Sequence, residues 1–311
     1  MKGNLDEGLR AIERAHRIVP RDASVLAALG YLKRRQGRFE EAINHFALAA
    51  RQDPLNPDHR LALATTNRAL RRYEEAERAY QRMADVSLDP TTALVQHGEL
   101  HLIWRGDPVP LREALASVPA DDATGTAALG TYRLAMIEGR YDDAATAMAR
   151  VGVDAIGGTG DARPVNLLRA WALLAAGDSA GARRSLEAAR SSLERQVRTG
   201  RTDGRLHAGL GLVLAGLGRT AEAIEHGRRA TALEPTATNA MYGPSYEADL
   251  AAIFAWAGEP DSALVRLERL LEVPAGISPH QLRLDPQWAP LRGDARFQAL
   301  AGSEPEPIAP S

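Results

Sequence analysis

The chain alternates apolar stretches of helical periodicity with short polar turns. Residues 23–56 predict two helices separated by a turn at Gly37. Each helix has one face of small and large apolar residues, namely Leu26, Leu29 and Gly30 on the first and Ala42, Phe46 and Ala49 on the second. Small residues let two helix backbones approach, while the large ones fill the space between them. The pattern therefore predicts a helical hairpin that ends at Pro54.

This hairpin recurs along the chain with a period of 34 residues. Pro20 and Pro54 are separated by that interval, and Ala76 and Tyr80 follow Ala42 and Phe46 by the same distance. Further on, the turn recurs at Gly139, Gly177, Gly218 and Gly258. The pattern tolerates Arg71 at one turn, and it is weakest over 94–118, where Pro108 and Pro110 occupy the expected turn. We interpret that stretch as a degenerate repeat.

The positions of small residues, turn glycine, aromatic residue and proline in 23–56 resemble the tetratricopeptide repeat family. The resemblance implies an all-α fold, a right-handed α-solenoid of about seven to eight helix-turn-helix repeats with a C-terminal cap. We expect one superhelical domain over 1–302, comprising a half repeat at 1–22, repeats at 23–56, 57–90, 91–122, 123–151, 163–202, 203–236 and 244–274, and a cap at 275–302. Residues 303–311 are expected to form a disordered tail.

Several segments depart from a regular array. The glycine-rich stretch 151–163 and the stretch 236–245 are predicted to be loops between repeats, and the helix beginning near Ala182 is predicted to run long, to about residue 205. The first repeat begins at its turn, Gly3, so the apolar face of the following helix lacks a cover. An uncovered solenoid end usually needs a cap or a neighbour. We therefore expect a truncated N-terminus or self-association through this half repeat.

The C-terminal segment around Trp288, Leu291 and Phe297 is predicted to cap the last repeat. Roughly the last 70 residues also resemble the ends of tetratricopeptide regions in bacterial signalling proteins. In those proteins the array follows a serine/threonine kinase, a nucleotide cyclase or a winged-helix regulator. The resemblance implies an alternative function, the regulatory part of such a protein whose catalytic or DNA-binding region is absent from this chain.

Charge and composition restrict the partners. The formal net charge is −2, and the arginine clusters, such as 195–205, are interleaved with acids and lack stacking aromatics, so no nucleic-acid partner is expected. No apolar run reaches the roughly 20 residues of a membrane helix. The absence of cysteine excludes disulfides and thiolate sites. We expect a cytoplasmic protein, or an extracytoplasmic one if it is part of a larger membrane-anchored signalling protein.

The motifs that suggest chemistry fail on context. Gly177–Gly181 matches a nucleophile-elbow pattern around Ser179, but a helix and not a strand is predicted before it. His97 and His101 are four residues apart on a predicted helix, yet Glu99 points to another face and no third metal ligand is identifiable. The glycines at 157, 158 and 160 lack the lysine of a phosphate-binding loop. We expect no enzyme activity, cofactor or metal site.

The resemblance implies that the first helices of successive repeats line a concave groove for a peptide or protein partner. Matching offsets place a mixed aromatic and charged surface there, comprising Tyr31, Arg34, Arg35, Arg68, Glu99, Arg133 and Trp171. Family members that bind acidic chaperone C-termini use a lysine, asparagine and arginine clamp, whereas Ala27, Tyr31 and Ala62 occupy the matching positions here. We therefore predict a non-catalytic scaffold or sensor module with a different protein or peptide partner.

Overall fold

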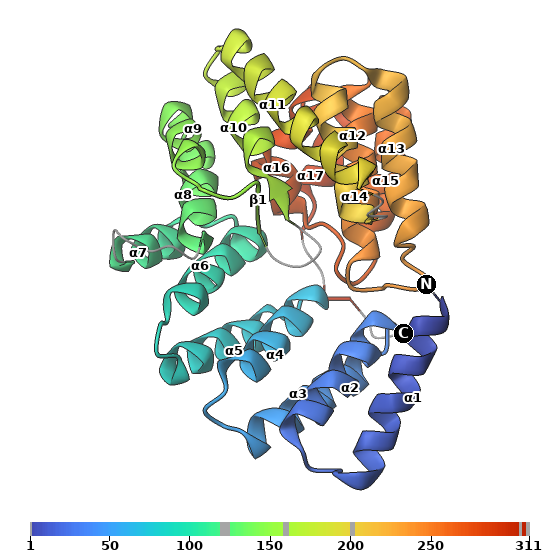
Figure 1. The fold of residues 1–311 in the computed structure, drawn as a ribbon. Coiled ribbons are helices and arrows are strands. Elements are labelled where there is room, and N and C mark those ends of the chain that lie inside the picture. Colours follow the sequence, from blue (N-terminus) through green and yellow to red (C-terminus); the bar gives the residue numbers. More distant parts are fainter. Residues whose placement is uncertain (1, 119–124, 158–161, 200–202, 305–306, 309–311) are drawn as a thin grey trace.

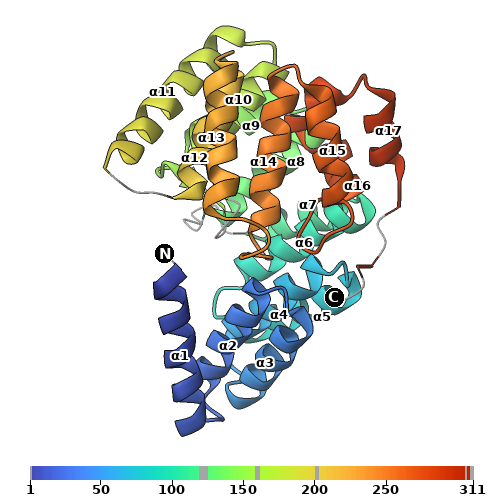
Figure 2. The ribbon, with the colours of Figure 1, turned by 90° about the vertical axis from the view of Figure 1, so that its right-hand side faces the viewer.

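The computed structural model describes residues 2–118, 125–157, 162–199, 203–304 and 307–308. Within these ranges the chain is a succession of paired antiparallel helices that curls around, so that the last helices return beside the middle of the array (Figure 1). The predicted all-α solenoid is confirmed. In a perpendicular view, α1–α5 lie below α10–α15 (Figure 2).

The helices are short and follow one another in sequence order. The first part contains α1 (Lys2–Ile18), α2 (Ala23–Arg35), α3 (Phe39–Gln52), α4 (Pro57–Ala69), α5 (Tyr73–Val86), α6 (Thr91–Arg105), α7 (Val109–Ser117), α8 (Thr126–Ile137) and α9 (Tyr141–Ala149). The second part contains α10 (Val165–Ala175), α11 (Ser179–Arg198), α12 (Gly204–Gly216), α13 (Thr220–Leu233), α14 (Gly243–Trp256), α15 (Pro260–Leu270), α16 (Pro279–Leu284), the 3-10 helix η1 (Pro286–Leu291) and α17 (Ala295–Gly302).

The packing inside a hairpin follows from the small and large residues of the repeat. Phe46 is fully buried between α2 and α3, and a Cβ added at Gly30 would lie 2.5 Å from its ring. Gly37 ends the pair's first helix with a φ of 81°, a left-handed conformation that glycine adopts without steric cost. Because an added Cβ would collide with the ring of Phe46, only glycine fits at position 30.

The stretch between α9 and α10 contains more than a loop. Two short strands, β1 (Ala155–Ile156) and β2 (Arg163–Pro164), pair antiparallel there. The glycines at 158 and 160 lie outside the described residues. In the weak fourth repeat, Gly106 ends α6 with a φ of 67°, and α7 begins after Pro108, so the turn lies two residues before the first of the two prolines.

Loops from the second part of the chain dock against turns of the first part. The amide of Ala240, in the predicted loop 236–245, donates to the carbonyl oxygen of Arg35 at 2.9 Å. The amide of Ala275 donates to the carbonyl oxygen of Ala69, also at 2.9 Å. These bonds join sequence-distant repeats, so the array is closed on itself at α2 and α4.

The end of the chain also returns to this place. The predicted tail 303–311 falls partly outside the described residues, but the amide of Ile308 donates to the carbonyl oxygen of Leu70 at 3.2 Å. The predicted long helix is α11, with 20 residues, and residues 200–202 of that prediction also lie outside the described ranges. No helix in the described ranges combines the length and hydrophobicity that a membrane span requires.

Candidate partner-binding site

The seven candidate groove residues lie on the first helices of five successive repeats, and they divide into two groups. Tyr31, Arg34 and Arg35 are on α2 and Arg68 is on α4, beside the docked loop 236–245. Glu99, Arg133 and Trp171 are on α6, α8 and α10, in the middle of the array. The structure therefore does not bring all seven into one open surface.

Arg34 has a structural role between α2 and α4. Its side chain is buried, with 5% of the residue exposed, and its guanidinium donates to the hydroxyl oxygens of Thr65 at 3.0 Å and Tyr242 at 3.4 Å. It also lies 5.0 Å from the ring centroid of Tyr31. Burial lowers the pKa of Arg34, yet an arginine remains protonated in proteins. Arg34 is thus a buried positive charge next to the ring of Tyr31.

Tyr31, Arg35 and Arg68 form the accessible part of the first group, and we call them the α2–α4 surface. Tyr31 is 46% exposed, and burial of the rest of its side chain raises its pKa. Arg35 pairs with Glu234 at 3.2 Å, and Arg68 donates to Oε1 of Gln96 at 3.5 Å. The α2–α4 surface combines an exposed aromatic ring with two partly exposed guanidinium groups.

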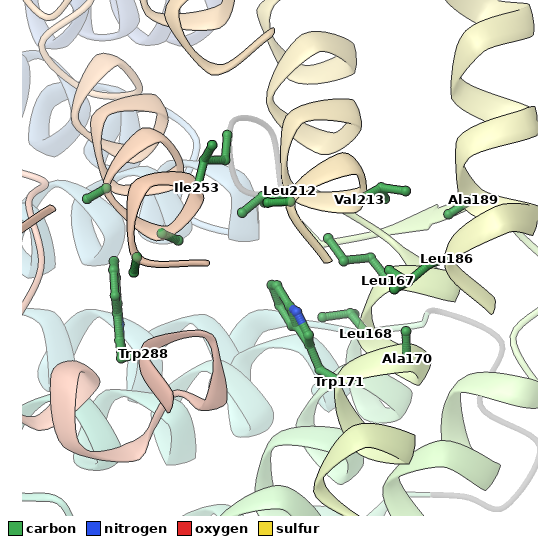
Figure 3. Close-up of a cluster of buried hydrophobic side chains, with 14 of the residues drawn as sticks. Leu167, Leu168, Ala170, Trp171, Leu186, Ala189, Leu212, Val213, Ile253 and Trp288 are labelled. Carbon is green, nitrogen blue, oxygen red and sulfur yellow. The ribbon is translucent and has the colours of Figure 1, made fainter. Parts of the chain in front are cut away.

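The second group is occupied by contacts within the chain. Glu99 is buried and accepts a hydrogen bond from Arg133 of the next repeat, 34 residues later. Trp171 is only 7% exposed and belongs to the main hydrophobic core, where it points towards the cluster that includes Leu212 (Figure 3). Glu99 and Trp171 therefore serve ion pairing and packing between repeats, whereas the side chain of Arg133, which pairs with Glu99, is 38% exposed, about as much as that of Arg35.

Residues 278–291, which we call the closing segment, pack in the same part of the molecule. The segment contains α16 and η1 and packs against first helices of the middle and late repeats. Leu284 packs against a cluster that includes Leu102 of α6 and Leu134 of α8, and Trp288 is fully buried in the same core as Trp171. The indole nitrogen of Trp256, on α14, donates to the carbonyl oxygen of Gln287 at 2.8 Å.

Charge also links the closing segment to the groove-side residues. Burial raises the pKa of Asp285, and the nearby positive charges of Arg163 and Arg133 oppose that rise. Arg163 itself forms an ion pair with the buried Asp249 of α14. The middle of the concave side therefore already holds a peptide segment, which is supplied by this chain.

The half repeat at the N-terminus contributes a single helix, α1. The predicted apolar face is half-buried at Ile12 and Ala15, and the side chain of Leu9 lies outside the described residues. At the end of α1, Ile18 is 79% exposed. Self-association through this helix stays a prediction.

The motifs that suggested chemistry lie in different settings. Ser179 is the exposed first residue of α11 and is preceded by α10, so the strand that a nucleophile elbow needs is replaced by a helix. Glu99 pairs with Arg133 of α8. Instead Glu77 of α5 approaches both rings, with its Oε1 3.4 Å from Nε2 of His97 and 3.1 Å from Nε2 of His101. Glu77 was not identified from the sequence, because it lies on the preceding helix and not in the segment that contains His97 and His101.

Comparisons with known proteins identify the repeat. A family model described as tetratricopeptide repeat matches residues 2–57, 27–91 and 167–238, which together make up more than half of the chain. A search of curated proteins finds no match. Similar solved structures include a tetratricopeptide repeat protein from Parabacteroides merdae ATCC 43184, with 19% identity and a TM-score of 0.49, covering 75% of this chain and 88% of that chain. Another is PilW, a type IV pilus biogenesis factor, with 13% identity and a TM-score of 0.34, covering 89% and 97% respectively.

Proposed function

Because this chain belongs to the tetratricopeptide repeat family, whose members are generally non-catalytic protein-interaction modules, we propose that it binds a protein or peptide through its α2–α4 surface. The observation that carries the proposal is the unequal coverage of the concave side. The closing segment packs against α6 and α14, and Glu99 of α6 and Trp171 of α10 are buried, whereas Tyr31 of α2 is 46% exposed. A partner that docks on the first helices finds its accessible contacts at the N-terminal end of the array.

The chemistry of this surface favours a peptide with acidic side chains and at least one apolar contact. Tyrosine and arginine are enriched among residues that dominate binding energy, because they combine large contact area with directional hydrogen bonds. Arg35 and Arg68 suit carboxylates in particular, since a guanidinium can donate two parallel bonds. Glu234 pairs with Arg35 in the free chain, so a carboxylate of the partner would replace it there.

The surface is tested by comparing captured proteins between variants. We expect Tyr31→Ala/Arg68→Glu to lose partners that the wild type captures, because it removes the aromatic ring and reverses one charge. Arg51→Glu is the matched control, since Arg51 is exposed in the last turn of α3, a second helix. Arg34→Glu is a poor test because it would bury a reversed charge. Retention of every partner by the double variant would show that the surface assignment is wrong.

A photo-crosslinking amino acid at position 31 makes the same test direct. Crosslinks at position 31 that are missing at position 51 would place the partner on the α2–α4 surface. Crosslinks at position 51 that are missing at position 31 would place the partner on the second helices of the repeats.

A further inference from the structure

Three side chains with metal-binding atoms converge between the third and fourth repeats. Glu77 comes from α5, while His97 and His101 lie one turn apart on α6. One potential ligand atom from each lies within 4.8 Å of the others. Of the described residues, these form the one group of three or more such side chains that meets this condition.

We propose that Glu77, His97 and His101 bind a divalent transition-metal ion of the Zn²⁺ class. Bonds of about 2.0–2.1 Å in a tetrahedral site place neighbouring ligand atoms about 3.3 Å apart. The distances from Oε1 of Glu77 to the two Nε2 atoms, 3.4 and 3.1 Å, bracket that separation. Three protein ligands leave the fourth position for water or for a side chain of a partner.

The surroundings hold the ligands in place while leaving access from solvent. The side chain of His101 is 8% exposed, whereas those of His97 and Glu77 are 25% and 26% exposed. Trp104 packs against His101 with ring centroids 5.8 Å apart, and Tyr73 stacks on Trp104 at 5.6 Å. Packed rings fix the orientation of the buried imidazole, which is the preorganisation that a metal site needs.

The donor set selects the metal. Two imidazole nitrogens and one carboxylate oxygen suit Zn²⁺, Co²⁺ or Ni²⁺, whereas Mg²⁺ and Ca²⁺ prefer oxygen ligands throughout. A bound ion would also join α5 to α6, at the entry to the repeat whose sequence pattern is weakest. The site would therefore stabilise the joint between the third and fourth repeats.

Titration of the full chain with Zn²⁺, in competition with a chromophoric chelator, tests the proposal. We expect one tight equivalent per chain, a higher melting temperature with Zn²⁺, and visible absorption of a tetrahedral type when Co²⁺ is used. His97→Gln/His101→Gln and Glu77→Gln should each lose this equivalent and the rise in melting temperature. Circular dichroism without metal confirms that the variants fold, and His97→Gln alone is the variant least expected to disturb packing.

His226→Gln is the matched control. Nδ1 of His226 lies 2.8 Å from Nδ1 of His207, so this variant removes a histidine from another close pair, on which no carboxylate ligand converges among the described residues. This variant should still bind one equivalent of Zn²⁺ per chain. Equal Zn²⁺ binding by the wild type and the His97→Gln/His101→Gln variant would overturn the proposal, as would loss of binding in His226→Gln.

Discussion

The guanidinium of Arg71 donates from Nη2 to the carbonyl oxygen of Ile277, 2.9 Å away and 206 residues later in the chain. Arg71 stands where other repeats have their turn glycine, and it has a left-handed φ of 56°. Ala275, two residues before Ile277, has a φ of 55°. Both strained residues thus lie where the two parts of the array meet, and the contacts made there compensate for the unfavourable backbone.

Two substitutions at Arg71 should separate the stability contributed by its hydrogen bond to Ile277 from the cost of its left-handed backbone. Arg71→Ala keeps the left-handed residue and loses a charged donor to a carbonyl, so we expect it to reduce the free energy of unfolding by about 2 kcal/mol. Arg71→Gly loses the same bond but relieves a backbone cost of about 1 kcal/mol, so it should be the more stable variant of the two. Urea unfolding measures both.

Gly139→Ala provides the control for the strain alone. Gly139 has a φ of 71° and nothing within 4 Å of an added Cβ, so this change introduces only the left-handed cost. Its effect should equal the difference between the two Arg71 variants. An Arg71→Ala variant as stable as the wild type would contradict a stabilising role for the bond to Ile277.

The ion pair between Glu99 and Arg133 should stabilise the joint between successive repeats. Arg133→Met leaves the buried carboxylate of Glu99 without this donor, and we expect a loss of about 2 kcal/mol in the free energy of unfolding. Glu99→Gln/Arg133→Met should lose less than the sum of the single variants. Arg112→Ala, in an exposed pair with Glu138, should change stability by only about 0.5 kcal/mol. Additive single effects would show that the two side chains do not interact.

The sequence predicted the structural features that depend on residues within one hairpin. Turn glycines such as Gly37, and close pairs such as Gly30 and Phe46, are required by one hairpin and were found from spacing alone. The closure of the array depends on the rotation accumulated over many repeats, which spacing does not contain. Arg71 was the indication of this closure that the sequence contained, because a residue other than glycine at a left-handed turn position needs a compensating contact.

The candidate site was predicted less completely for a related reason. Helical offsets placed Trp171 and Arg133 on the first helices of their repeats, but residue types that form binding surfaces also fill cores and ion pairs. Trp171 lies in a core that the middle repeats, the late repeats and the closing segment form together. The offsets define which face a side chain occupies, and the distant segment decides whether that face is open.

Acidification should destabilise the late repeats through a histidine pair. The rings of His207 and His226 stack at 5.0 Å, with their Nδ1 atoms 2.8 Å apart, so one ring must donate and the other accept. Burial lowers the pKa of both, and His226 further lowers that of His207. The charged groups that act on the pair are Asp203 and Arg229 near His207, and Glu194, Glu222 and Glu225 near His226.

The sign follows from the lowered pKa values. The unfolded chain binds protons more readily than the folded chain, so stability is fully present above about pH 6.5 and falls as the pH drops below that value. Measured between pH 7.5 and pH 5.5 by urea unfolding, the loss should be smaller in His207→Gln than in the wild type. An unchanged pH dependence in that variant would show that the pair does not contribute.

Trp288 should hold the closing segment in the concave side. Its ring is fully buried, so Trp288→Ala should reduce the free energy of unfolding by about 3–5 kcal/mol, whereas Trp288→Phe should retain part of that stability because a ring still fills the site. Hydrogen exchange should become faster in α10 and α14, whose residues share the core with Trp288. Val265→Ala, at a 47% exposed position of α15, is the control and should leave exchange unchanged. If exchange in α10 is as slow in Trp288→Ala as in this control, the segment does not secure the middle repeats, and their concave side would be available to a partner.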